Sequence, residues 1–265
     1  MEHTYWHKQT ASAPLYPDIA WSKPEMRSLS GKLAIVGGNK LGFSAVAEAY
    51  QTALETGVGQ AKVLLPDVLK KNVPPAIVDA LFASSNPSGG FSKDAYHDLR
   101  ALGEWADGIL FVGDAGRNSE TAVLFEQFIG EYDRPLTLTR DAIDLVKNNP
   151  KLLIERPNTL VVASFAQVQK LFQGVYYPKM LTFSMQLTQL VENLHKFTIT
   201  YPITIATFHN ENLVIAHGGE VTTTKWENPM EIWRGIVATR CACYWLWNTL
   251  LPLESTTASL LLETN

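Results

Sequence analysis

Short apolar runs alternate with helical segments along most of the chain. These runs have the length and composition of buried strands, and the first three end at glycine or proline. They cover residues 32–38, 61–65, 108–112, 135–138, 159–162 and 203–205. Because parallel strands need crossover connections that are usually helical, this order predicts a largely parallel sheet with helices on both faces.

Helices are predicted between these strands, and a hairpin is predicted near the end of the chain. Residues 44–54 are rich in alanine and are followed by two glycines, while apolar residues at helical spacing mark a helix near 187–194. Further helices are expected at 118–129, after the two prolines at 74–75, and at 229–250. Residues 212–217 and 221–224 flank a glycine pair and predict antiparallel edge strands.

The length of 265 residues suits one large α/β domain, so we expect a single domain over residues 1–265. Residues 1–29 carry prolines and aromatic residues but no apolar run. We therefore expect them to wrap the surface and not to be a signal peptide. The most apolar stretch, 232–253, contains Arg234 and Arg240, which favours a buried helix over a membrane span. The protein is accordingly expected to be cytoplasmic and to have no membrane partner.

Composition and charge exclude several classes of protein. Only 18% of residues are charged and 46% are hydrophobic, which argues against disorder. The net charge of -4 argues against a nucleic-acid partner. Cys241 and Cys243 stand one residue apart, cannot easily bridge and are expected to be reduced. The six histidines show no metal-ligand spacing and no Ser/His/Asp set is evident, so no protein-held metal site is expected.

Two glycine-bearing turns follow predicted strands, at the sheet edge where α/β proteins bind ligands. Residues 37–44 superficially resemble a phosphate-binding P-loop, but Phe43 stands where that motif needs Lys, which excludes it. Such a turn can still present backbone N–H groups to a polar ligand, or it is only a tight turn that needs glycine. Residues 112–118 form a similar turn, in which Arg117 is either an anion ligand or a surface charge.

Two carboxylates are candidates for chemistry, each with a structural alternative. Asp141 follows the fourth strand and either faces a ligand or caps a helix. Glu231 lies at the start of the last helix, where it is either a general base or a favourable charge at the helix N-terminus. The late tryptophans fit core packing, with an oligomer contact as the alternative.

The order of these segments resembles the ADP/ATP-dependent NAD(P)H-hydrate dehydratases of the ribokinase-like superfamily, over about residues 31–237. Residues 31–38 with 42–45 resemble the family's first strand and its glycine, aromatic, Ser/Thr, small-residue turn. Residues 57–66 resemble the next strand, ending in proline, and 106–121 resemble the glycine-rich loop and its helix. The resemblance implies a ribokinase-like three-layer α/β sandwich, with ADP or ATP as cofactor and Mg as a further expectation.

The resemblance also implies roles for individual residues. Glu231 would be the catalytic base that deprotonates the hydroxyl of hydrated nicotinamide. The nucleotide would be bound by Asn228, Pro229, Met230 and Thr207. The substrate would be bound by Asn39, Phe43, Ser44, Gly113, Gly116, Asp141, Ser164 and Gln167. The family's bacterial members commonly form homo-oligomers, so a homo-oligomer that binds a small nucleotide ligand is expected here.

Several family motifs are altered in this chain. Residues 228–231 stand at the Gly-Ser-Gly-Asp signature, whose glycine N–H groups hold the nucleotide phosphate. Here Pro229 has no N–H to donate, and the carboxylate of Glu231 sits on an arm longer by one C–C bond, about 1 Å. In the Asp-Ala-Asp-Ala pattern Thr139 replaces the first Asp. The His-Pro-Gly-Glu motif appears as residues 164–167, and Leu-Lys-Gly as 205–207 without its Lys.

These features leave three functions open. The first is NAD(P)H-hydrate dehydratase activity, with Glu231 as base. The second is a divergent member with weakened or lost catalysis that binds a nucleotide or a partner, which the altered motifs favour. The third is another small-molecule kinase of the same superfamily.

Overall fold

The computed structural model describes residues 4–261 of the chain. Its strands form one ten-stranded sheet in the order β1-β10-β9-β8-β7-β6-β5-β2-β3-β4. Their bounds are β1 Trp6–Gln9, β2 Lys32–Gly37, β3 Gln60–Pro66, β4 Ala80–Ala83, β5 Gly108–Gly113, β6 Leu136–Thr139, β7 Thr159–Ala163, β8 Thr204–His209, β9 Asn212–His217 and β10 Glu220–Lys225. Neighbours pair in parallel except at β8–β9 and β9–β10, which confirms the largely parallel sheet and the late hairpin.

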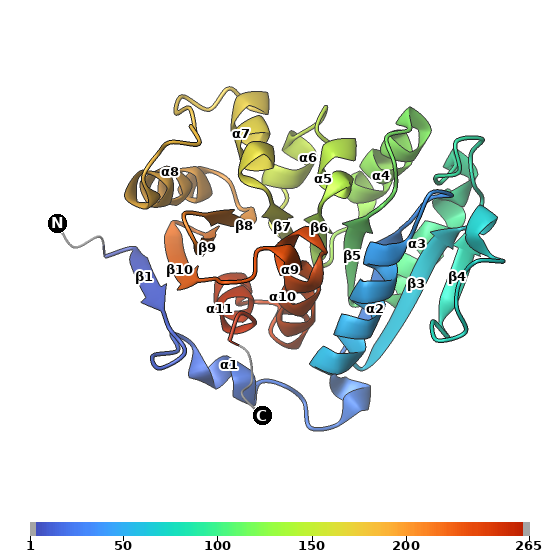
Figure 1. The fold of residues 1–265 in the computed structure, drawn as a ribbon, viewed down its shortest axis with the longest axis horizontal. Helices are drawn as coiled ribbons and strands as arrows, with labels where there is room; N and C mark the ends of the chain where they lie inside the picture. The colour runs from blue at the N-terminus through green and yellow to red at the C-terminus, as the bar shows by residue number, and fades with distance from the viewer. Residues whose placement is uncertain (1–3, 262–265) are drawn as a thin grey trace.

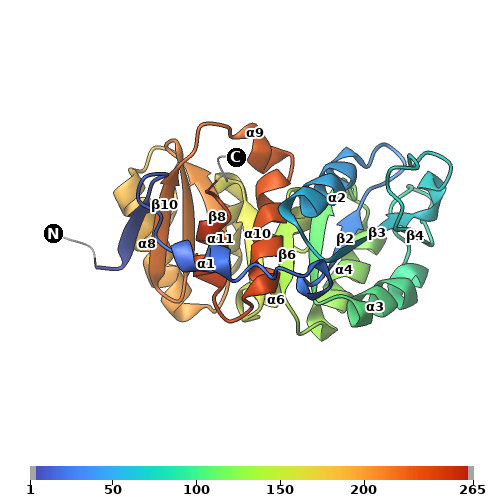
Figure 2. The same cartoon turned by 90° about the horizontal axis from the view of Figure 1, so that it is seen from below.

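Helices cover both faces of this sheet, so the chain has three layers (Figure 1). Their bounds are α1 Pro17–Trp21, α2 Ser44–Thr56, α3 Tyr96–Trp105, α4 Ser119–Glu131, α5 Asp141–Leu145, α6 Lys151–Ile154, α7 Phe165–Gly174, α8 Leu187–Thr200, α9 Met230–Trp233, α10 Ile236–Trp247 and α11 Pro252–Ala258. Helices α2, α10 and α11 lie on one face, and α3 to α8 lie on the other (Figures 1 and 2). The fold class expected from the sequence is thus confirmed.

The apolar strand runs supply both cores because successive side chains point to opposite faces of a sheet. In β2, Ala34 and Val36 pack with the α3–α8 layer, whereas Leu33 and Ile35 pack with α2 and α10. Such alternation of fully buried residues on both faces is what a near-continuous apolar run predicts.

Eight elements were not predicted from the sequence, and two predictions need correction. The additional elements are strands β1 and β4 and helices α1, α3, α5, α6, α7 and α11. The helix expected after residues 74–75 does not form; turns there lead into β4 instead. The final helix is two helices, α9 and α10, because the chain breaks at Gly235 in a left-handed conformation with φ 88°.

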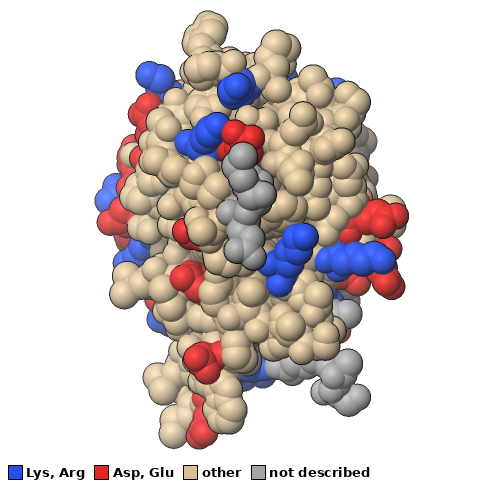
Figure 3. Space-filling model, turned by 90° about the vertical axis from the view of Figure 1, so that its left-hand side faces the viewer, with Lys and Arg blue, Asp and Glu red and all other residues tan. Residues whose placement is uncertain are grey.

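The segment before β2 contributes to the sheet as well as to the surface. β1 is an edge strand that pairs in parallel with β10. The apolar side chain of Ile19 in α1 packs with Ala258 of α11. Figure 3 shows the side of the molecule that bears β1 and α8, where charged side chains are scattered between uncharged ones.

The last long helix is a buried element of the core. Cys241 and Cys243 of α10 are buried and unbridged, and burial raises the pKa of the Cys241 thiol to about 11. Over residues 4–261, no helix is both long and apolar enough to span a membrane.

Candidate functional site

The two glycine-bearing turns meet because β2 and β5 are neighbours in the sheet. The N–H of Gly38 donates to the carbonyl of Gly113 over 2.9 Å, and the side-chain amide of Asn39 donates to the carbonyl of Asp114. Both glycines have positive φ, 86° and 97°, a region that favours glycine. The predicted residues Asn39, Gly113 and Gly116 therefore lie at one sheet edge.

Asp141 shapes the second turn. Its carboxylate oxygens accept hydrogen bonds from the N–H groups of Asp114 (2.8 Å) and Gly116 (3.2 Å). Burial raises the pKa of this carboxyl, because desolvation penalises its charged form more than the two backbone donors favour it. Asp141 is the first residue of α5 and does not cap that helix; Arg140 holds the N-cap position.

A second carboxylate joins this turn to α2. The carboxylate of Asp114 accepts a hydrogen bond from the N–H of Ala45 over 2.9 Å and is 3.5 Å from the Ser44 hydroxyl. The guanidinium of Arg140 donates to its other oxygen over 2.6 Å. This carboxylate therefore satisfies the first turn of α2, whose own N-cap, Phe43, has no side-chain acceptor and packs instead against the core.

Asp114 and Arg140, the two partners of this ion pair, both have a strained backbone conformation. Both have φ 56°, and a residue with a Cβ in such a sparsely populated conformation costs about 1–3 kcal/mol. Residues in such conformations cluster at functional sites, because only a well-braced surrounding keeps them there.

Replacing Arg140 should separate the ion pair from the backbone strain. Arg140→Ala removes the partner of a partly buried carboxylate but keeps the strain, so the free energy of unfolding should fall by about 2 kcal/mol. Arg140→Gly also relieves the strain of the positive φ, so its free energy of unfolding should fall by about 1 kcal/mol less than that of Arg140→Ala. Urea denaturation of both variants measures the difference; a glycine variant no more stable than the alanine variant would show that Arg140 is unstrained.

A cavity of about 280 Å³ opens beside this turn at the carboxyl ends of β6 and β7. Among the residues that line it are Thr139, Arg140, Asp141, Ser164, Gln167, Lys170 and Trp233. A second cavity of about 530 Å³ shares Asp141, Asp144 and Lys170 with it and extends along the start of α4. Three of the predicted substrate-side residues thus line the first cavity together.

Two of these residues also build the wall of the cavity. Ser164 and Gln167 form a capping box at the start of α7, in which each side chain bonds the other's backbone. The side-chain amide of Gln167 also donates to the carbonyl of Arg140 (2.7 Å) and to the Asp144 carboxylate (2.9 Å). The chain therefore uses part of its predicted substrate motif to join α7 to the loop after β6.

Sequence reasoning missed several side chains of this cavity, among them the Asp144 carboxylate. Arg140 and Lys170 bring positive charge, and Trp233 brings an aromatic ring that is about half exposed. Of these, Arg140 could have been identified from the sequence, because it directly precedes Asp141 at the end of a predicted strand. Lys170 and Trp233 carry no such positional signal.

Two residues of the segment expected to hold the nucleotide phosphate, Asn228 and Glu231, are already bonded within the protein. The N–H of Glu231 donates to the carbonyl of Asn228, and the N–H groups of Ile232 and Trp233 donate to that of Pro229. The carboxylate of Glu231 accepts from Arg240 over 3.0 Å and from the Asn228 side chain over 3.3 Å. This arrangement is poorly suited to a phosphate, because Pro229 has no N–H and that of Glu231 already donates within the protein.

Thr207, the predicted nucleotide-binding residue on β8, is covered by the protein. The hydroxyl of Thr207 is buried and has no hydrogen-bond partner in the described part of the chain. The described residues contain no group of three His, Cys, Asp or Glu placed to hold a metal ion. The carboxylates of Asp114, Asp141 and Asp144 accept from protein donors, so they are not arranged as Mg ligands.

Comparison with known proteins supports the fold. No protein-family model matches the sequence, and no curated protein matches it. A ribokinase-like superfamily protein from Enterococcus faecalis V583 aligns with a TM-score of 0.73 and 15% identity, over 98% of this chain and 87% of that one. An ADP/ATP-dependent NAD(P)H-hydrate dehydratase from Bacillus subtilis, co-crystallised with ATP/Mg2+, aligns with a TM-score of 0.62 and 13% identity, over 97% of this chain and 87% of that one.

A kinase shares the same architecture. The phosphomethylpyrimidine kinase from Clostridium difficile 630 aligns with a TM-score of 0.55 and 10% identity, over 86% of this chain and 96% of that one. At these identities the similarity establishes the fold and leaves the activity open. The chain therefore has the ribokinase-like fold, shared by structures that include an NAD(P)H-hydrate dehydratase and a small-molecule kinase.

Proposed function

We propose that this chain is a divergent ribokinase-like protein that binds a small polar ligand and has lost nucleotide-dependent dehydration of hydrated NAD(P)H. One observation carries the proposal: the carboxylate of Glu231 is bonded to Arg240 and Asn228. A base must be within hydrogen-bond reach of the proton that it removes.

The ligand cavity supports the binding half of the proposal. One cavity is lined by side chains of both charges, by polar groups and by the Trp233 ring. The charged ones are Arg140, Lys170, Asp141 and Asp144, and the polar ones include Ser164 and Gln167. Such a mixture suits a ligand with a planar ring and polar groups, as nucleotides and their precursors have. The cytoplasmic location and the homo-oligomeric state remain part of the proposal.

A second candidate is another kinase-like transfer, since a kinase shares the fold. It needs the same anion-holding backbone at residues 228–231, where Pro229 has no N–H and that of Glu231 already donates to Asn228. The geometry therefore favours a binding protein over either enzyme.

The proposal is tested by measuring turnover and binding on the same protein. We expect no conversion of hydrated NADH at micromolar enzyme with ADP or ATP, for the unmodified protein and for Glu231→Gln. Calorimetry with NADH, nicotinamide precursors, ADP and ATP should detect binding of at least one. Ala166→Phe, which places a ring in the cavity, should weaken that binding at least tenfold.

The matched control is Ala101→Phe, on the exposed surface of α3, which should bind as the unmodified protein does. Turnover that Glu231→Gln abolishes in a folded protein would contradict the loss of catalysis. Binding that Ala166→Phe leaves unchanged would place the ligand elsewhere.

A further inference from the structure

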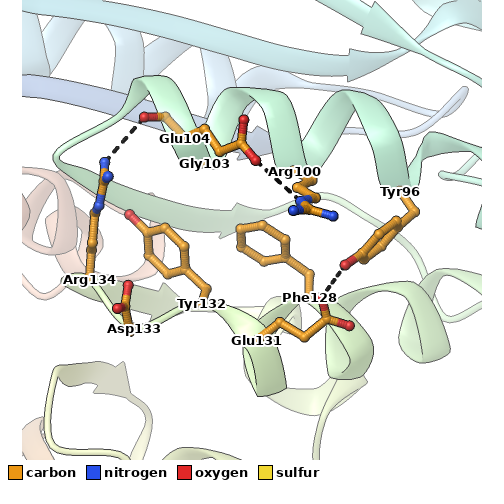
Figure 4. A pocket seen from close by; sticks show the side chains of 9 residues that line it. All are labelled: Tyr96, Arg100, Gly103, Glu104, Phe128, Glu131, Tyr132, Asp133 and Arg134. Atoms are coloured by element: carbon orange, nitrogen blue, oxygen red, sulfur yellow. Dashed lines mark hydrogen bonds and ion pairs between the residues drawn. The ribbon is translucent and has the colours of Figure 1, made fainter.

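A separate cavity of about 260 Å³ lies between α3 and the end of α4 (Figure 4). Two of its lining residues precede strands of the sheet: Glu104 lies just before β5 and Arg134 just before β6. The cavity is therefore at the amino ends of these strands. The candidate site lies at their carboxyl ends. A ligand here would therefore be independent of the function proposed above.

The side chain of Tyr132 is a buried polar group that points into this region without a partner. Figure 4 shows its hydroxyl directed towards the space between Arg134 and Glu104. The residue is only 9% exposed, and its hydroxyl has no hydrogen-bond partner among the residues described. Leaving a buried hydroxyl unbonded is costly, and such groups in native proteins call for an explanation.

The ring of Tyr132 cannot easily turn to find a partner. Phe128 stacks on it with ring centroids 5.1 Å apart, and the Arg156 guanidinium lies 5.6 Å from its centroid. That guanidinium is fixed in turn by the backbone carbonyls of Tyr132, Arg134 and Asn158. Burial also raises the pKa of the Tyr132 hydroxyl, which keeps its proton available as a donor.

The rim of the cavity carries both signs of charge. Arg100 pairs with Glu104 across 3.2 Å, and Arg134 donates to the carbonyl oxygens at the end of α3. Glu131 accepts a hydrogen bond from Tyr96, and Asp133 also lines the cavity. Hydrogen-bond donors and acceptors from α3 and from the end of α4 thus surround the rings of Phe128 and Tyr132 (Figure 4).

We infer that this cavity binds a small zwitterion, an α-amino acid with an apolar side chain. Its carboxylate accepts from the Tyr132 hydroxyl and an arginine, and its side chain covers the Phe128 ring. Its ammonium group faces Asp133, because the Glu131 carboxylate already accepts from Tyr96. A lone anion such as phosphate meets three carboxylates here, and a lone cation meets two guanidinium groups. The volume is just below the range of about 300–1,000 Å³ for drug-sized ligands, which suits an amino acid.

The test is calorimetry on the full chain with L-leucine and L-phenylalanine, each against two analogues. For leucine these are isoamylamine, which lacks the carboxylate, and 4-methylpentanoate, which lacks the ammonium group. We expect the zwitterion to bind and each analogue to bind at least tenfold more weakly. Tyr132→Phe should weaken leucine binding about fivefold to tenfold, as the loss of one hydrogen bond does.

Two further results separate a binding role from a structural one. Tyr132→Phe removes an unpaired buried hydroxyl, so it should raise the melting temperature of the free protein while it weakens binding. Asp133→Asn should weaken binding of leucine but leave that of 4-methylpentanoate unchanged. The matched controls are Tyr176→Phe, which is 92% exposed, and Glu192→Gln on α8, neither of which should alter binding. No binding of either amino acid at 10 mM, or equal binding of the analogues, overturns the inference.

Discussion

Phe111→Ala is expected to lower the free energy of unfolding by about 3–5 kcal/mol, the cost of truncating a buried aromatic side chain. Phe111 is fully buried in the centre of β5. Its ring packs against Phe125 and Phe128 of α4, with centroids 4.5 Å and 6.0 Å away. Alanine loses these contacts and leaves a cavity that the rigid sheet cannot close. Chemical denaturation of the variant and the unmodified protein measures the difference.

The matched control for this change is Phe183→Ala. Phe183 is 67% exposed and contacts Phe165 at a centroid distance of 5.0 Å. Its truncation removes little buried surface, so the loss should stay below about 1 kcal/mol. Equal losses in the two variants would contradict the role of the β5–α4 layer as the centre of the core.

The strands with long apolar runs were predictable because their side chains are buried on both faces. β2 and β5 need no other residues to be recognised as central strands. β1 has only four residues, Trp-His-Lys-Gln, and β4 also has four. Such short edge strands depend on backbone pairing with a neighbour, which the sequence of the strand itself does not reveal.

The candidate site was predictable in part for a similar reason. The position of Asp141 at the end of β6 and of Ser164 at the end of β7 follows from the strand order, and these residues line one cavity. The environment of Glu231 could not be predicted from the strand order. Its bond to Arg240 joins α9 to α10 across the break at Gly235, and the sequence predicted a single helix there.

In the glycine-rich turn after β5, the side chain of Asp141 leaves no room for a side chain at position 113. Gly113→Ala is expected to destabilise the protein by about 3–5 kcal/mol, among the largest single effects. A Cβ there would lie 2.2 Å from the Oδ1 atom of Asp141, and the residue has φ 97°. Both causes act together, since the carboxylate cannot withdraw without losing its bonds to the N–H groups of Asp114 and Gly116. Guanidinium denaturation measures the loss.

The control is another glycine-to-alanine change, for which the opposite sign is expected. Gly130 lies in α4 with ordinary backbone angles, and a Cβ there would meet Leu152 at 3.7 Å, a normal contact. Gly130→Ala should raise the free energy of unfolding by up to about 1 kcal/mol, because alanine loses less conformational entropy in a helix. If Gly113→Ala unfolds no more easily than Gly130→Ala, then Asp141 is free to move. The turn at the end of β5 would then not be braced by its carboxylate.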